Sequence, residues 1–110
     1  MNSNLDRLVE TFDKMKSNGF DIDAPLIWGF YFIDKNKKKL KALFDELKEK
    51  NYILIDIYKS EGGDEWTLHA SKIDILTPEK LHKRNNAFND LADSCDVELY
   101  DGWDVEKIEA

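Results

Sequence analysis

Apolar residues recur every three or four positions in three stretches of the chain, residues 3–18, 36–50 and 78–95. This spacing places them on one face of a helix. In the first stretch Leu5, Leu8, Val9, Phe12 and Met15 form the stripe. Start and stop signals accompany the pattern. Ser3 and Asp6 form an imperfect capping box, Asn18-Gly19 follows the first stretch, and Thr77 precedes Pro78. We therefore predict three amphipathic helices.

Four other stretches have the composition of strands. Residues 25–34 are rich in aromatic and β-branched residues, and residues 52–58 and 65–73 alternate around the sequence EGGD, which is typical of a hairpin loop. Residues 97–100, with the sequence VELY, form a short fourth run. We expect a tight turn at Asp101-Gly102 after it, with Trp103 behind the turn.

The resulting order is a leading helix followed by β-α-β-β-α-β, which is the ferredoxin-like split βαβ pattern. We predict an α+β fold with an antiparallel four-stranded sheet, forming one domain over residues 1–110. Right-handed crossovers place both crossover helices on one face of such a sheet, so the other face stays open. The first helix either covers part of this open face or extends the helical layer. The side chains expected to face the helices are Trp28, Phe30, Phe32, Ile53, Ile55, Ile57 and Trp66. Those expected on the open face are Tyr31, Tyr58, Thr67, His69, Ser71 and Tyr100.

Charge and composition narrow the possible partners. The 110 residues carry a formal net charge of −7, which repels nucleic acid and anionic membranes. The single cysteine excludes an internal disulfide and fits a reducing compartment. We find no targeting segment and no apolar stretch of about 18 residues that could span a bilayer. We expect a cytoplasmic protein without a direct nucleic-acid or membrane partner.

Few residues indicate catalytic chemistry. His69 and His82 lack the spacing of a zinc site, and Cys95 lies on an apolar stripe, which favours a buried, inert thiol. His69 facing an open groove could act as a general base, but a polar surface role is more common for such a residue. Asp21 and Asp23 lack the rest of a calcium loop and favour turn formation. We expect no enzyme activity, no metal and no cofactor.

Five lysines lie between residues 35 and 41, at the start of a predicted helix. Such a cluster could bind an acidic partner segment or an RNA backbone. It could also be a solvated helix face balanced by the acidic residues that follow, which is the interpretation we favour.

Trp103 has two possible roles. A tryptophan is costly to expose, so it either closes the core beside the last strand or anchors a partner.

The C-terminal sequence DVELYDGW, residues 96–103, resembles the end of the regulator of ribonuclease activity B family, the ribonuclease E inhibitors. A Pro-initiated helix precedes it, as in that family, and the first helix ends in Asn18-Gly19. Asp21, Asp23 and Ala24 also resemble the family's entry into the first strand. Tyr100 to Trp103 is the most specific part of the resemblance, which implies a ferredoxin-like protein that binds the non-catalytic scaffold region of the endoribonuclease. The resemblance further implies that such binding restrains RNA decay without catalysis.

Three hypotheses follow. The leading one is a non-enzymatic module that binds a protein partner through Tyr31, Tyr58, His69, Tyr100, Asp101, Gly102 and Trp103. The second is a small-ligand binder or enzyme on the open sheet face, using Tyr31, Tyr58, His69 and Asp56. The third is a weak RNA binder that uses the Lys35–Lys41 cluster through Lys37, Lys38, Lys39 and Lys41. The sequence leaves the oligomeric state, the exact partner and the binding face open.

Overall fold

Three helices and four strands follow one another in the order expected from the sequence. The computed structural model describes residues 1–109; residue 110, the last of the expected domain, lies outside the described residues. The elements are α1 (Leu5–Ser17), β1 (Leu26–Asp34), α2 (Lys37–Lys48), β2 (Ile53–Lys59), β3 (Trp66–Asp74), α3 (Pro78–Ser94) and β4 (Leu99–Glu106). No helix among them is long and apolar enough to cross a membrane.

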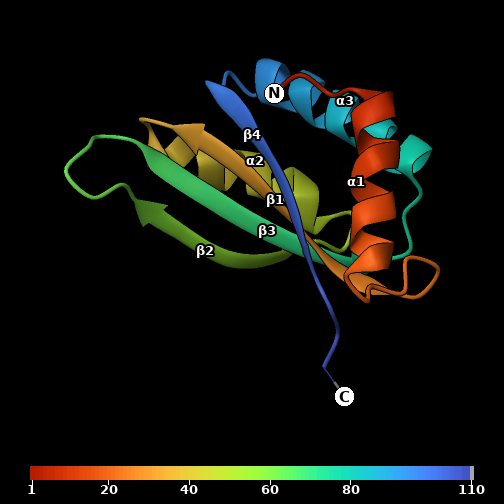
Figure 1. Ribbon diagram of the computed structural model, residues 1–110. Coiled ribbons are helices and arrows are strands. Elements are labelled where there is room, and N and C mark those ends of the chain that lie inside the picture. The colour runs from red at the N-terminus through yellow and green to blue at the C-terminus, as the bar shows by residue number, and fades with distance from the viewer. Residues whose placement is uncertain (110) are drawn as a thin grey trace.

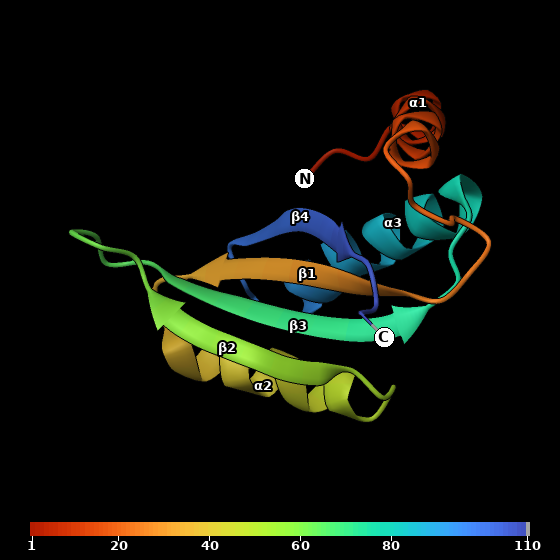
Figure 2. The ribbon, with the colours of Figure 1, turned by 60° about the horizontal axis from the view of Figure 1, so that its bottom comes forward.

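The strands form one antiparallel sheet in the order β2-β3-β1-β4. This is the order of the ferredoxin-like fold, and Figure 1 shows the four strands side by side. In Figure 2, α2 lies partly behind β2, and α1 stands beside α3; α2 also contacts β1 and β3. All three helices therefore lie on the same side of the sheet, and its other face carries no secondary structure within residues 1–109.

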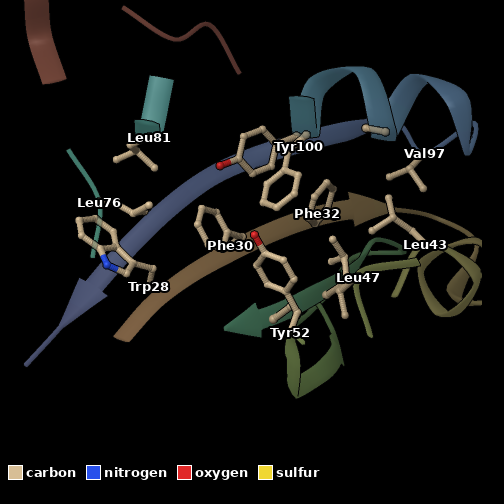
Figure 3. Packing of buried hydrophobic residues seen from close by; sticks show 14 of the residues in the cluster. Trp28, Phe30, Phe32, Leu43, Leu47, Tyr52, Leu76, Leu81, Val97 and Tyr100 are labelled. Atoms are coloured by element: carbon tan, nitrogen blue, oxygen red, sulfur yellow. The ribbon is translucent and has the colours of Figure 1, made fainter. Parts of the chain in front are cut away.

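The core lies between the sheet and the helices. Trp28, Phe30 and Phe32 alternate along β1 and are buried on the helical face, as the sequence predicts (Figure 3). Phe88 of α3 packs edge-on against both phenylalanines, with ring centroids 5.0 Å from Phe30 and 5.5 Å from Phe32. Burial of each such aromatic side chain contributes about 1.5–3 kcal/mol. The central strand is thus the main anchor of the helical layer.

The first helix extends the helical layer instead of covering the open face. Phe12 of α1 stacks on Trp28 of β1 at 5.7 Å, and α1 also contacts α3. Leu8, Phe12 and Met15 of its apolar stripe are buried, whereas Leu5 and Val9 are exposed. The helix starts one residue later than the expected capping box, because the side chain of Asn4, not Ser3, accepts the N–H of Arg7.

The C-terminal sequence does not form a turn, which corrects the expectation for Asp101-Gly102. Strand β4 continues from Leu99 through these residues to Glu106. The pairing with β1 shifts between Tyr31 and Phe32, so Asp101 is the extra residue of a β-bulge. Gly102 has a φ of +115°, which a residue with a side chain rarely adopts. The Asp-Gly pair therefore changes the register of a strand and does not reverse the chain.

Strand β2 contains a second bulge, which corrects the expected facing of its isoleucines. Its pairing with β3 shifts between Leu54 and Asp56, so Ile55 is the extra residue. As a result only Ile57 packs against the core, while Ile53 and Ile55 are exposed on the open face. A period of two predicts a shared face only while the ladder is regular. The bulge breaks this condition.

Candidate functional site

The open face of the sheet carries polar-aromatic residues together with exposed apolar side chains. Tyr31 and His69 lie opposite each other on the central strands β1 and β3, and Tyr58 lies on β2 opposite Thr67. These three positions agree with the sequence prediction. Around them lie isoleucines of the three strands, of which Ile53 is 57% and Ile73 55% exposed. A sheet face of this kind is unusually apolar for an uncovered surface.

Tyr31, His69 and Asp104 form the best-ordered cluster on this face. The Tyr31 and His69 rings stack with centroids 4.3 Å apart and planes inclined by 18°. The Tyr31 hydroxyl donates a 2.6 Å hydrogen bond to Oδ2 of Asp104 on β4. Partial burial, followed by this bond to a carboxylate, raises the pKa of Tyr31 well above its ordinary value of 10.0. Tyr31 is therefore a neutral hydrogen-bond donor at physiological pH.

A cavity of about 120 Å³ lies beside this cluster, over Gly29 of β1. A Cβ atom at Gly29 would overlap Oδ1 of Asp104 and would lie 2.8 Å from Nε2 of His69. The absence of a side chain at Gly29 therefore creates the hollow and lets these two groups approach the backbone. The residues that line the cavity are Ile27, Gly29, Ile55, His69, Ser71, Asp104 and Glu106.

The four predicted site residues of β4 do not join this cluster. Tyr100 is only 1% exposed and lies on the helical face, which corrects its expected place on the open face. Trp103 lies on the same face, half-buried, with its ring 5.7 Å from Trp28. Asp101 is exposed at the bulge, and Gly102 is buried opposite Tyr31. Trp103 was expected either to close the core or to anchor a partner. It packs against the core, and its contact with a partner stays a prediction.

A chain of hydrogen bonds holds Tyr100 in the core and ties the start of the chain to α3. The Tyr100 hydroxyl donates to Oδ1 of the buried Asn85 at 2.6 Å. Asn85 Nδ2 donates to Ser3 Oγ at 3.3 Å, and Ser3 Oγ lies 2.7 Å from Nδ1 of His82. Burial raises the pKa of Tyr100 strongly. His82 therefore has a structural partner.

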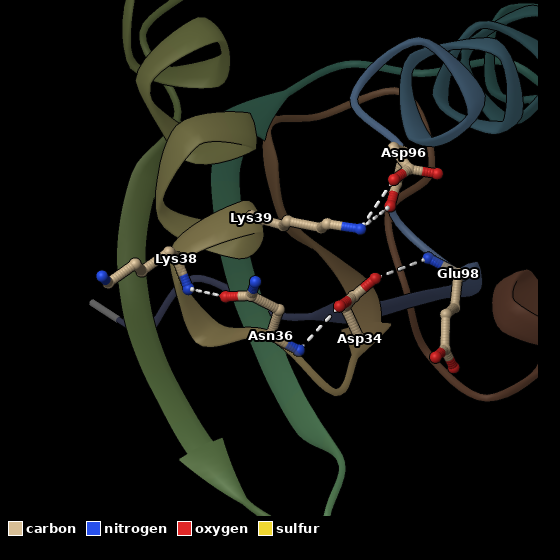
Figure 4. Close-up of polar contacts among 6 residues, drawn as sticks. All are labelled: Asp34, Asn36, Lys38, Lys39, Asp96 and Glu98. Carbon is tan, nitrogen blue, oxygen red and sulfur yellow. Dashed lines mark hydrogen bonds and ion pairs between the residues drawn. The ribbon is translucent and has the colours of Figure 1, made fainter.

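The lysine cluster lies beside a groove at the start of α2, shown in Figure 4. Lys39 Nζ bonds Oδ2 of Asp96 at 2.7 Å, which raises the pKa of Lys39 and lowers that of Asp96. Lys37 Nζ lies 4.6 Å from the ring centroid of Trp66. Asp34 and Glu98 line the same groove. Two of the lysines thus already have partners, and the nearby carboxylates oppose phosphate binding.

Other candidate groups have structural contacts. The Asp23 N–H donates to Oδ1 of Asp21 at 3.1 Å, which confirms the expected turn role of this pair. Cys95 is half-buried, not fully buried, and its Sγ donates to Oε2 of Glu46 at 3.2 Å. Burial, with the contact to Glu46, raises the pKa of Cys95 and so disfavours the reactive thiolate. Within residues 1–109 no group of three or more His, Cys, Asp or Glu side chains could hold a metal ion.

Three residues that shape the site were not among the predicted site residues, although Ser71 was correctly expected on the open face. Asp104 bonds Tyr31, Gly29 creates the cavity, and Ser71 is 5% exposed at its wall. The clue for Gly29 was present, because a glycine inside an apolar strand often marks a close approach to the backbone. Asp104 could not be placed, because the expected turn left it outside the sheet.

Comparison with known proteins identifies the family of the chain. No curated protein is similar enough to count as a match. The family model described as RraB, regulator of ribonuclease activity B, matches residues 6–105. This range runs from the first turn of α1 to Val105, the second-last residue of β4. It therefore includes the whole sheet apart from Glu106. The chain therefore belongs to the regulator of ribonuclease activity B family.

Proposed function

We propose that this protein restrains an endoribonuclease of the ribonuclease E type by binding it, without catalysing a reaction itself. Its family is one of regulators of ribonuclease activity. Binding to the scaffold region of that enzyme is the form of regulation that the sequence resemblance implies. The open face of the sheet is the surface that we assign to the partner.

The observation that carries this proposal is the set of apolar side chains left exposed on that face. Ile53, Ile55 and Ile73 are each more than half exposed, and Tyr58 extends the same surface. Exposed apolar patches on a small protein commonly mark contact surfaces, because their burial against a partner is favourable. The helical face, in contrast, is already occupied by α1, α2 and α3.

The polar groups of the face support binding more than catalysis. A general base needs a proton-bearing substrate group within hydrogen-bond reach, in a cleft that holds the substrate. The cavity over Gly29 has a volume of only about 120 Å³, whereas small-molecule sites commonly measure about 300–1,000 Å³. The Tyr31 hydroxyl is also committed to Asp104. These features favour a contact surface with one small recess.

The proposal is tested by retention of the purified endoribonuclease, including its scaffold region, on the immobilised protein, and by RNA cleavage with and without the protein. The wild-type protein should retain the enzyme and slow cleavage. Ile73→Glu, which places a charge on the open face, should weaken both effects about tenfold or more, because an interface centre excludes unpaired charge.

Val9→Glu is the matched control, because Val9 is 41% exposed on α1, in the helical layer. It should retain the endoribonuclease as well as the wild type. Loss of binding in Val9→Glu but not in Ile73→Glu would refute the assignment to the open face. Failure of the folded wild-type protein to retain the enzyme would refute the proposed function itself.

A further inference from the structure

The cavity over Gly29 presents carboxylate oxygens that form no ion pair with any cationic side chain of residues 1–109. Oδ1 of Asp104 faces the space that a side chain at position 29 would occupy, and Glu106 lines the same cavity. Within residues 1–109 the ion pairs are Lys39–Asp96 and Arg84–Asp74, so neither of these two carboxylates has a charged partner.

The two lysines nearest in sequence to the cavity wall are engaged elsewhere. Lys72 Nζ lies 5.2 Å from the ring centroid of Tyr52 on the helical face, and Lys107 Nζ lies 5.0 Å from that of Phe20. The negative charge of the cavity is thus not balanced by the adjacent side chains. An incoming cation would gain charge-assisted hydrogen bonds there.

Ser71 adds a hydroxyl without an internal partner to the wall of the cavity. It is only 5% exposed and lines the cavity, and none of the side-chain hydrogen bonds within residues 1–109 involves its hydroxyl. Within residues 1–109 every fully buried side-chain N or O atom has a hydrogen-bond partner, so the unpaired Ser71 hydroxyl must be reachable by an incoming group. His69 Nε2, on the same wall, also has no hydrogen-bond partner among the described residues.

The volume of the cavity and the apolar residues of its wall indicate which kind of cation fits. A volume of about 120 Å³ corresponds to roughly four water molecules at about 30 Å³ each, which suits the end of one side chain. Ile27 and Ile55 form apolar parts of the wall. Such a wall can pack against the methylene stem of lysine or arginine while the charged end reaches the carboxylates.

We propose that the cavity over Gly29 binds the cationic end of a lysine or arginine side chain of the bound protein partner, with Asp104 and Glu106 as its acceptors. This inference rests on the proposed function, because it specifies a contact of the same open face. Ser71 and His69 complete the set of polar groups around the cation, and the isoleucines of the face pack against apolar neighbours of that residue in the partner.

The first test uses the blocked amino acids N-acetyl-lysine methylamide and N-acetyl-arginine methylamide, titrated into the protein and followed by the amide resonances of Gly29 and Ser71. Both probes should shift these resonances, and the same blocked lysine with its side-chain amine acetylated, which carries no positive charge, should not. Asp104→Asn keeps an acceptor for Tyr31 but removes the charge, and should weaken binding about tenfold, the effect of losing one charge-assisted hydrogen bond. Asp45→Asn, an exposed carboxylate on α2, is the control with the same charge change and should bind like the wild type.

The second test repeats the endoribonuclease retention with the same two variants. Asp104→Asn should retain the enzyme less well, and Asp45→Asn should retain it like the wild type. If the wild-type protein retains the enzyme and Asp104→Asn does so equally, this inference fails while the proposed function stands. If the probes bind at Gly29 but the enzyme is not retained, the proposed function fails and the cation site stands. Equal weakening by Asp104→Asn and Asp45→Asn would show a general charge effect and would overturn the inference.

Discussion

The two edge strands contain the same irregularity with opposite results. Strands β2 and β4 each have a bulge, and both bulges adjoin the row in which Asp56, His69, Tyr31 and Gly102 pair across the sheet. In β4 the bulge places Tyr100 and Trp103, three residues apart, on the helical face. In β2 it packs Ile57 against the core and leaves Ile55 outside.

The difference shows that a bulge does more than bend an edge strand. A regular strand would put Tyr100 and Trp103 on opposite faces. The bulge in β4 therefore completes the core, whereas the bulge in β2 adds apolar surface to the open face. The first serves stability and the second, in our proposal, serves binding.

The largest expected effect is a difference in stability between two variants, one with a substitution in β4 and one with a substitution in β2. Tyr100→Ala should lower the free energy of unfolding by about 3–5 kcal/mol, because it opens a cavity and leaves Asn85 without its donor. Ile55→Ala should change it by less than about 1 kcal/mol, because the side chain is 52% exposed. Urea unfolding of both variants measures the difference. Similar losses in the two would contradict the assignment of separate roles to the bulges.

A smaller effect is expected from the backbone of the β4 bulge. Gly102→Ala should cost about 1–3 kcal/mol, because alanine is strained at a φ of +115° although the nearest atom, Met1 Sδ, leaves room at 3.7 Å. The bulge in β2 contains no residue of positive φ. Its extra residue should therefore accept Ile55→Val with almost no loss. Thermal unfolding of the pair checks this, and an unaffected Gly102→Ala protein would show that the bulge relaxes.

The smallest effect concerns the two tyrosines beside the β4 bulge at alkaline pH. The folded-state pKa values of Tyr31 and Tyr100 lie above the ordinary value of 10.0, mainly because of burial. Their contribution to stability is therefore complete below about pH 10 and is lost as the pH rises further, because the unfolded chain ionises first. Tyr31→Phe should reduce this loss. Urea unfolding midpoints at pH 8 and above about pH 10 measure this loss. If the pH dependence of Tyr31→Phe equals that of the wild type, the predicted contribution of Tyr31 is wrong.

Most of the fold follows from local patterns. Trp28, Phe30 and Phe32 alternate in a regular central strand, and Thr77 before Pro78 marks the start of α3, so both were predicted correctly. The errors lie in the edge strands. Residues Asp101 and Gly102 have the composition of a turn, and only the pairing with β1 shows that they continue the strand. Local propensity cannot distinguish these cases, because the register depends on a partner strand about 70 residues away.

The candidate site was predictable only in part. Tyr31, Tyr58 and His69 were assigned to the open face because their strands alternate regularly at these positions. The cavity was not predicted, since it arises from a missing side chain at Gly29 and from Asp104 on a different strand. A hollow of this kind depends on what three strands place around one residue.

The buried carboxylate of Asp34, at the end of β1, links two connections of the chain. Oδ1 accepts the N–H of Asn36 at 2.7 Å, and Oδ2 accepts that of Glu98 at 2.9 Å (Figure 4). One side chain thus holds the entrance to α2 and the entrance to β4. Opening of either connection removes a bond that helps to orient the carboxylate for the other. The amide hydrogens of Asn36 and Glu98 should accordingly exchange with solvent in a single cooperative event.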